Sequence, residues 1–188
     1  MKKIICMLLA CMLCVTALGG CQGQKEPITE DDFKFYDENG QIQNLTQGDF
    51  FSYYMSQAEK IAGKTLQTKR GVKLGDPMSV IAEKYDLSKL GAGYYYEKLN
   101  LNVKELKELN DSFPTAEDAF NHLDEIKAKV DNEETDYITF TCCLLDSGEF
   151  IELENLNDRS GYGMGFRMIP KDGDFIITEI ILERYESK

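Results

Sequence analysis

The chain of 188 residues has the length of one ordinary domain, and it carries 33 Asp or Glu against 21 Lys or Arg, a net charge of −12. Such an acidic chain is repelled by nucleic-acid phosphates and by anionic lipid headgroups, because proteins that bind these groups use clustered Lys and Arg. We therefore expect no nucleic-acid partner. Hydrophobic residues make up 43% of the chain, which is enough for a buried core.

The first 21 residues have the order of a secretion signal. Met1-Lys2-Lys3 give a positive start, residues 4 to 18 are apolar except for Thr16, and Gly19-Gly20 precede Cys21. This segment resembles the signals of diacylglycerol-anchored bacterial lipoproteins, in which the cysteine is lipidated and becomes the first mature residue. The resemblance implies that residues 1 to 20 are cleaved, that Cys21 carries lipid including palmitate, and that the domain lies on the outer face of the cytoplasmic membrane. A retained membrane helix is the alternative, but it needs roughly 20 apolar residues and this run stops at two glycines.

The mature chain is expected to begin with the lipidated cysteine and a flexible tether, residues 21 to 32, followed by a single domain over residues 33 to 188. The tether is polar and contains Pro27 and the run Glu30-Asp31-Asp32. Residues 33 to 36 and 41 to 43 flank Asn39-Gly40, a strong short signal for a β-hairpin. We therefore predict an N-terminal β-hairpin.

Apolar residues at helical spacing predict four helices, over residues 50 to 62, 77 to 85, 102 to 110 and 115 to 130. We expect Asp76 to cap the second helix, and Thr115 with Asp118 to form a capping box at the fourth. The fourth helix has a long apolar face, which we expect to pack on a sheet.

The last third of the chain supplies that sheet. Its expected strands are residues 137 to 145, 149 to 155, 162 to 169 and 175 to 184, with turns at Asp146-Ser147-Gly148 and Lys171-Asp172-Gly173. Ile138, Phe140, Cys142 and Leu144 alternate in the first strand and should face the core. The predicted fold class is α+β, with helices packed on a C-terminal four-stranded antiparallel β-meander that an N-terminal β-hairpin precedes.

Residues 68 to 76, Thr-Lys-Arg-Gly-Val-Lys-Leu-Gly-Asp, followed by a helix that ends at Tyr85, resemble an R-G-I-x-x-G-D segment of small secreted and lipid-anchored proteins of Gram-positive bacteria. More distantly, the order of elements is similar to the fold of the assembly lipoprotein BamE and of beta-lactamase inhibitory protein, and both of these are binding proteins. The motif residues are Arg70, Gly71, Gly75, Asp76 and Tyr85. We interpret them as structural, because glycines allow tight turns and Asp76 can accept backbone hydrogen bonds.

Two patterns are candidates for binding. Tyr94-Tyr95-Tyr96 could stack on sugar rings, or they could line a strand edge with the outer rings turned in and the middle ring out. Gly161, Gly163 and Gly165 alternate along a strand and leave one face bare, where an aromatic ring or another chain could lie close.

Three further features are better explained by structure than by catalysis or metal binding. His122 is the sole histidine and is expected on the surface of a helix. Residues 131 to 136 form an acidic loop that is better explained by solvation than by calcium, because the loop lacks the glycine and the final glutamate of a calcium-binding loop. Cys142 and Cys143 are expected to be buried free thiols, since neighbours on a strand point to opposite faces.

We expect no enzyme activity, no metal and no cofactor. The first hypothesis is a lipid-anchored extracytoplasmic protein that binds another envelope or secreted protein. The alternative is a receptor for a small molecule or a glycan, with Tyr94, Tyr95 and Tyr96 as the site. The identity of the partner, the pathway and the oligomeric state stay open.

Overall fold

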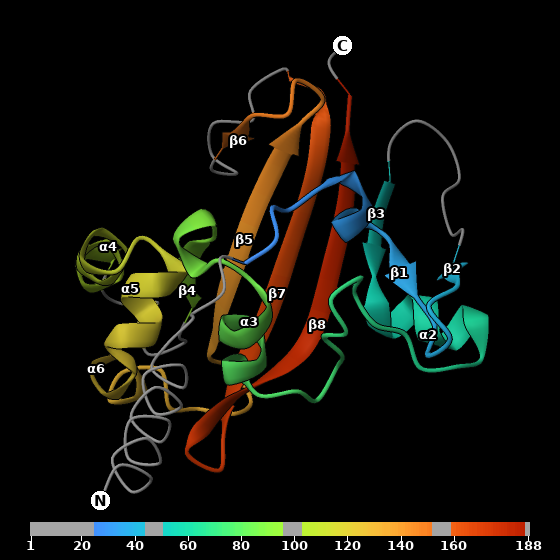
Figure 1. Cartoon of the computed structure of the whole chain (residues 1–188). Helices are drawn as coiled ribbons and strands as arrows, with labels where there is room; N and C mark the ends of the chain where they lie inside the picture. The colour runs from blue at the N-terminus through green and yellow to red at the C-terminus, as the bar shows by residue number, and fades with distance from the viewer. Residues whose placement is uncertain (1–24, 44–50, 96–102, 152–158, 187–188) are drawn as a thin grey trace, which may run out of the picture.

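A computed structural model describes residues 25–43, 51–95, 103–151 and 159–186, and Figure 1 shows their arrangement. The helices are η1 (Glu30–Phe33), α2 (Met55–Ala62), α3 (Met78–Lys84), η2 (Leu87–Lys89), α4 (Val103–Ser112), α5 (Ala116–Asn121) and α6 (Leu123–Lys127). The strands are β1 (Phe35–Tyr36), β2 (Ile42–Gln43), β3 (Phe51–Tyr54), β4 (Gly91–Tyr95), β5 (Tyr137–Leu145), β6 (Phe150–Ile151), β7 (Gly161–Lys171) and β8 (Asp174–Tyr185). The protein is therefore a mixed α+β fold.

The main sheet has six strands, in the order β3-β8-β7-β5-β4 with β6 paired to β5, and all its pairings are antiparallel. Cys143 of β5 pairs with both Ile151 of β6 and Gly163 of β7, so β6 lies on the side of β5 away from β7. The predicted meander is thus wrong in its order. Among the described residues, β5 pairs with β7 over residues 138 to 145 and with β6 at Cys143 and Leu144, so β5 lies between β6 and β7.

Turn chemistry sets the register of the strongest strand pair. Asp172 and Gly173 have φ values of 50° and 80° and connect Lys171 directly to its partner Asp174. Two successive positive φ values match the twist of a tight hairpin, and aspartate and glycine tolerate them best. At the N-terminus, β1 pairs antiparallel with β2 on either side of Asn39-Gly40.

The first predicted helix begins later than expected. Residues 51 to 54 form strand β3 against residues 181 to 184 of β8, and α2 starts only at Met55. The aromatic residues of β3 suit a strand, and the pairing partner is 130 residues away in the chain, so local periodicity cannot reveal it. Glu179 of β8 accepts hydrogen bonds from the backbone nitrogen (3.0 Å) and the hydroxyl (2.5 Å) of Ser56, which satisfies the start of α2.

The fourth predicted helix is divided in two. Thr115 and Asp118 form the expected capping box, so the start is confirmed. The helix is then interrupted at His122, whose φ and ψ of −121° and 30° are not helical. No proline or glycine marks this break in the sequence.

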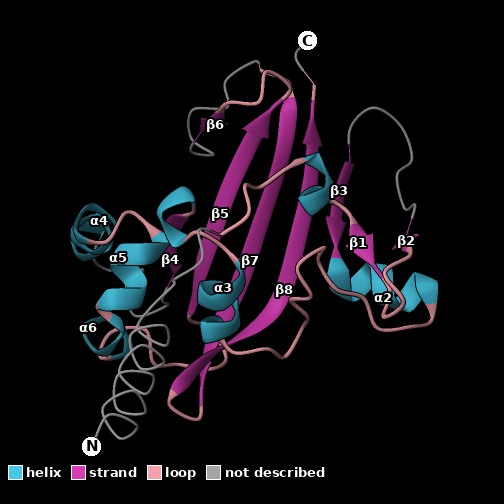
Figure 2. Ribbon diagram, in the orientation of Figure 1, coloured by secondary structure: helices cyan, strands magenta, loops and turns pink. Residues whose placement is uncertain are grey.

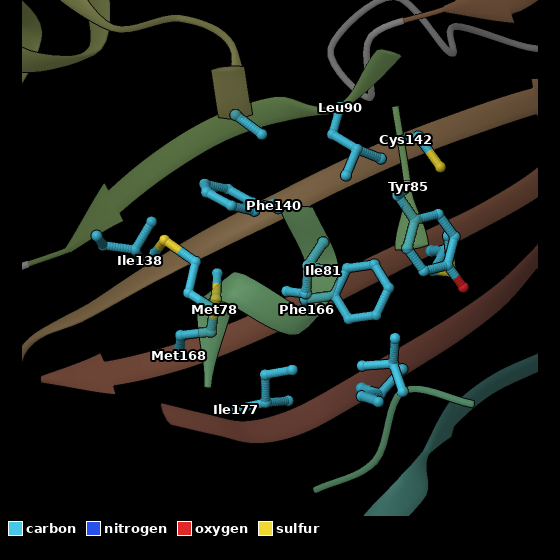
Figure 3. Packing of buried hydrophobic residues seen from close by; sticks show 14 of the residues in the cluster. Met78, Ile81, Tyr85, Leu90, Ile138, Phe140, Cys142, Phe166, Met168 and Ile177 are labelled. Carbon is cyan, nitrogen blue, oxygen red and sulfur yellow. The ribbon is translucent and has the colours of Figure 1, made fainter. Parts of the chain in front are cut away.

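Helix α3 lies over one face of the main sheet, as Figure 2 shows, and α5 packs against η2 and β4. The alternating residues of β5 that were predicted to face the core are all buried, and the same holds for Met164, Phe166 and Met168 of β7. Met78, Ile81 and Tyr85 of the α3 region pack over them in Figure 3, with the Tyr85 and Phe166 rings 5.3 Å apart. Among the described residues, no helix has the length and apolarity needed to cross a bilayer.

The segment just before β1 belongs to the fold. Ile28 and Phe33 are buried in the core, and Asp32 is fully buried. The expected flexible tether over residues 21 to 32 is therefore wrong from Lys25 onward, and residues 21 to 24 lie outside the described ranges. The prediction was wrong because this segment is polar and acidic overall, although Ile28 packs in the core and Asp32 forms a buried ion pair with Arg70. We refer to residues 25 to 33 as the strap.

Candidate functional site

The three tyrosines of the predicted glycan site do not form one platform. Tyr94 points to the core face of the sheet, where its hydroxyl donates a 2.8 Å hydrogen bond to the carbonyl of Phe113 and burial raises the pKa of Tyr94. Tyr95 points to the opposite face and is 41% exposed. The alternation with an inner Tyr94 and an outer Tyr95 is thus confirmed, while Tyr96 lies outside the described residues. Of the two tyrosines that the structure describes, Tyr95 is the one that can meet a ligand on the open face.

Two residues that the sequence did not single out complete the surroundings of Tyr95. Its ring stacks on the ring of its cross-strand partner Tyr137, with centroids 4.8 Å apart and planes 16° apart. The guanidinium of Arg167 lies 4.0 Å from the centre of the Tyr137 ring. We call these three residues the Tyr95 cluster. Stacking and cation–π contact hold the rings in fixed positions, which lowers the entropy that a ligand must remove on binding.

Small residues lie beside the Tyr95 cluster on the same sheet face. Gly91 of β4, Thr141 of β5 and Gly165 of β7 are in direct cross-strand register, and Gly93 pairs with Thr139 one row away. A Cβ atom on Gly165 would meet Thr141 only at 3.6 Å, an ordinary contact. We call these five residues the small-residue floor. The row continues through Ile181 to Tyr54, which is 39% exposed, so aromatic rings flank the floor on both sides.

The other glycines of β7 have local packing reasons. A Cβ atom on Gly163 would lie 2.9 Å from the ring of Tyr185, and one on Gly161 would lie 2.6 Å from the carbonyl oxygen of Leu144. An aromatic ring thus lies close to the bare strand, as the glycine spacing predicted. Gly161 and Gly163 are therefore explained by close packing, whereas of these three glycines Gly165 is the one at which a Cβ atom would make only ordinary contacts.

Arg70 and Tyr85, from the segment over residues 68 to 85, lie at a buried ion pair. Arg70 contacts the carboxylate of Asp32 at 2.5 Å, and the side chains of the pair are 11% and 0% exposed. The same guanidinium donates to the carbonyls of Glu26, Pro27 and Lys84 and lies 4.8 Å from the centre of the Tyr85 ring. Arg70 therefore joins the strap to the C-terminal end of α3.

The remaining motif residues shape the chain between Arg70 and α3. Gly71 and Gly75 have φ values of 84° and 88°, which side-chain-bearing residues avoid. Asp76 does not cap α3 as predicted, since its carboxylate accepts a 2.8 Å hydrogen bond from the backbone nitrogen of Lys73. The motif positions Asp76 one residue too early, with Pro77 between it and the helix. These contacts favour the structural interpretation of the motif.

His122 lies on the surface, as predicted. Its Nδ1 is 2.9 Å from the carbonyl oxygen of Asp118, and its ring is 4.8 Å from that of Phe113. Nothing in these contacts activates a nucleophile.

The acidic loop 131 to 136 is organised by its last residue. The buried carboxylate of Asp136 accepts hydrogen bonds from the backbone nitrogens of Asp131 and Asn132 and from the hydroxyl of Thr135. Within the described ranges, no group of three or more His, Cys, Asp or Glu side chains is placed to hold a metal ion.

Cys142 and Cys143 are free and buried, as predicted. Burial raises the pKa of both thiols, that of Cys143 to about 11, where the charge of Glu183 adds to the effect. Neither thiol is therefore an activated nucleophile near neutral pH.

Comparison with known proteins gives no assignment: no family model, curated protein or solved structure matches the chain.

Proposed function

We propose that this chain is a lipid-anchored extracytoplasmic protein of the bacterial envelope that binds another envelope or secreted protein and has no catalytic activity. The observation that carries the proposal is the open sheet face, where exposed Tyr95 and Tyr54 flank the small-residue floor. A floor of small side chains allows the backbone or a large side chain of a partner to approach closely. Tyrosine and arginine are the residues most often found at the energetic centres of protein interfaces.

The proposed anchor rests on residues 1 to 21. In the lipoprotein prediction, cleavage before Cys21 leaves a cysteine that carries a diacylglyceryl group on its thiol. Each buried methylene contributes about 0.8 kcal/mol, so two or more acyl chains would hold the domain at the membrane far better than one. Mature residues 21 to 188 then stand on the outer face of the cytoplasmic membrane with 33 acidic and 19 basic side chains.

The likeness of residues 68 to 85 to segments of small secreted and lipid-anchored proteins supports the same class. So does the similarity in element order to BamE and beta-lactamase inhibitory protein, since both work by binding. This support is one of resemblance, and the open face supplies the independent physical argument.

A receptor for a glycan or a small molecule is the second candidate, and the Tyr95 cluster favours it. Sugar rings stack on exposed aromatic faces, and Tyr95 is half-exposed and held in place by Tyr137. A glycan receptor would depend on Tyr95 of β4 but not on Tyr54 of β3, because β4 and β3 are at opposite ends of the strand order. A protein interface of about 800 Å² per partner would depend on both.

Capture of the partner on living cells tests the proposal. The full-length protein with a C-terminal tag is cross-linked in place, and the material that comes with it is compared with that from an unrelated tagged lipoprotein. We expect one protein to be enriched, and we expect Tyr95→Ala and Tyr54→Ala each to lower its recovery about tenfold or more, the loss of roughly 1.4 kcal/mol or more of binding free energy.

Ile61→Ala is the matched control, because Ile61 is an exposed apolar residue of α2 outside the open face. Equal recovery from wild type, Tyr95→Ala and Tyr54→Ala would contradict binding through this face. Binding to a glycan array by the wild type and by Tyr54→Ala, but not by Tyr95→Ala, would favour the second candidate. For the anchor, Cys21→Ala should leave the membrane fraction; if it stays there at the wild-type level, the lipoprotein assignment is wrong.

A further inference from the structure

We propose that the strap side of the domain lies against the membrane and that the open sheet face points away from it. The strap side is the surface formed by residues 25 to 33, α3 and η2. This inference rests on the proposed lipidation of Cys21, and it adds an orientation to the proposed function. The occupant of the strap side is the headgroup layer of the lipid bilayer.

The strap holds its first residue, Lys25, against the end of α3. Lys25 donates hydrogen bonds from Nζ to the carbonyls of Ala82 and Tyr85 at the end of α3, the latter at 2.6 Å. Arg70 holds the next residues through the carbonyls of Glu26 and Pro27. A cation at a helix C-terminus is well placed for these bonds. Lys25 is the described residue nearest to Cys21 in the chain, and these bonds hold it against the end of α3.

That point lies over the middle of the sheet, because Lys25 binds the Tyr85 carbonyl, Tyr85 packs on Phe166 of β7, and β7 has β8 and β5 on its two sides. Figure 1 shows the strap crossing the sheet on the same side as α3. The ring centroids of Phe33 in the strap and Tyr162 in β7 are 5.5 Å apart. Ile28 and Phe33 anchor the strap in the core between these layers. The open face, with Tyr95, Tyr137 and Arg167, is the opposite side of the same sheet.

The length of the remaining chain decides the orientation. Cys21 is four residues from Lys25, and four residues span at most about 14 Å even when fully extended. A domain of about 160 residues has a radius of gyration near 15 Å, which corresponds to a sphere of about 20 Å radius. A leash of about 14 Å that starts in the middle of one face cannot reach around to the other. The membrane must therefore meet the half of the domain that carries the strap, and it cannot meet the open face.

Charge agrees with this placement. Residues 25 to 37 and 64 to 90, which build the strap side and its surroundings, contain eight basic and eight acidic residues. The rest of the mature chain contains 11 basic and 25 acidic residues. An anionic bilayer surface repels like charge within about a Debye length, roughly 10 Å at 0.1 M salt. Residues 25 to 37 and 64 to 90 thus carry no net charge together, and such a surface repels them less than it repels the rest of the domain, although the strap side itself has three basic and five acidic residues.

The orientation can be measured by fluorescence quenching on the intact lipoprotein. The protein is purified from membranes, lipid on Cys21 is read from its intact mass, and the sample is reconstituted into vesicles of phosphatidylcholine and phosphatidylglycerol with a nitroxide on the headgroup. A bimane label is placed at Ser79→Cys, an exposed position of α3, or at Thr141→Cys on the open face. The native Cys142 and Cys143 are buried and do not compete for the label.

We expect headgroup nitroxides to quench the label at residue 79 at least threefold more strongly than the label at residue 141. Insertion of a twenty-residue Gly/Ser linker between Gln24 and Lys25 should remove the difference, because the leash then reaches around the domain. Equal quenching without the linker, or stronger quenching at residue 141, would overturn the orientation while leaving the anchor intact. A mass without lipid on Cys21 would overturn both the anchor and the orientation.

Discussion

Removal of the Arg70 guanidinium is the sharpest test of how the strap is held. In Arg70→Met the carboxylate of Asp32 stays buried without its charged partner, while the aliphatic part of the side chain is kept. Removing one member of a buried ion pair typically costs 3–5 kcal/mol. Asp32 keeps hydrogen bonds from the backbone nitrogen (2.8 Å) and hydroxyl (3.3 Å) of Thr29, so we expect the lower part of that range, about 3 kcal/mol.

The loss is large compared with a total stability of about 5–15 kcal/mol for a typical domain. For a domain of this size it corresponds to a fall of roughly 6–12 °C in melting temperature. The assay is urea unfolding at pH 7 followed by circular dichroism, with the slope against urea compared between variants to confirm that the same surface is exposed.

Lys69→Met is the matched control. Lys69 is the neighbouring cation and lies 3.9 Å from Asp31, but both side chains are exposed, so the expected loss is below about 1 kcal/mol. The double variant Arg70→Met/Asp32→Asn should be more stable than the sum of the two single losses predicts, because no unpaired buried charge remains. If Arg70→Met costs no more than Lys69→Met, the buried pair does not hold the strap and the reasoning fails.

Four further outcomes follow from particular contacts. Burial raises the pKa of Tyr85, and the nearby Thr68 hydroxyl only partly offsets this effect. Among the described residues, no partner hydrogen-bonds the Tyr85 hydroxyl in normal geometry, so Tyr85→Phe should leave the free energy of unfolding in urea unchanged or raise it. A fall of more than about 1 kcal/mol in that free energy would reveal a hydrogen bond. In β7, Gly161→Ala should lower the free energy of unfolding by about 1–3 kcal/mol, because its Cβ would meet the Leu144 backbone. Gly163→Ala should lower it less, because the Tyr185 ring can shift, and Gly165→Ala should leave it nearly unchanged. The reverse order of melting temperatures would contradict this description of the packing. Cys142 and Cys143 should react with Ellman's reagent at pH 8 only after unfolding, and rapid reaction of the native protein would show that the thiols are accessible. Hydrogen bonds from the Gln41 backbone and from Lys64 lower the pKa of Asp37 in the folded state. The contribution of Asp37 to stability is therefore present above its unfolded pKa of about 3.9 and is lost as the pH falls through the lower folded value. The difference in unfolding free energy between wild type and Asp37→Asn should become smaller from pH 7 to pH 3, and a constant difference would exclude the carboxylate as its cause.

Local signals predicted the elements whose causes are local. The strand over residues 137 to 145 matches β5, because a period of two along nine residues records which face is buried. The capping box at Thr115 and the Asp172-Gly173 turn were also found, since their chemistry lies within four residues.

The errors arose where distant segments meet. The predicted helix over residues 50 to 62 wrongly includes β3, because the partner of β3 in β8 lies far along the chain. The predicted tether wrongly includes the strap, because Asp32 binds Arg70 38 residues away. The Tyr95 cluster could be found only in part. Tyr95 was named, but Tyr137 and Arg167 join it through the pairing of β4, β5 and β7, which no local pattern records.

The open sheet face as a partner surface is the central claim, and site-specific photo-crosslinking on living cells tests it most directly. A benzophenone side chain replaces Thr141, which has Gly91 and Gly165 as its cross-strand neighbours and so has room for a large group. The control position is Ser79 on the strap side. We expect a discrete covalent adduct with another envelope or secreted protein from residue 141 and none from residue 79. An adduct from residue 79 alone, or no adduct from residue 141, would contradict the account.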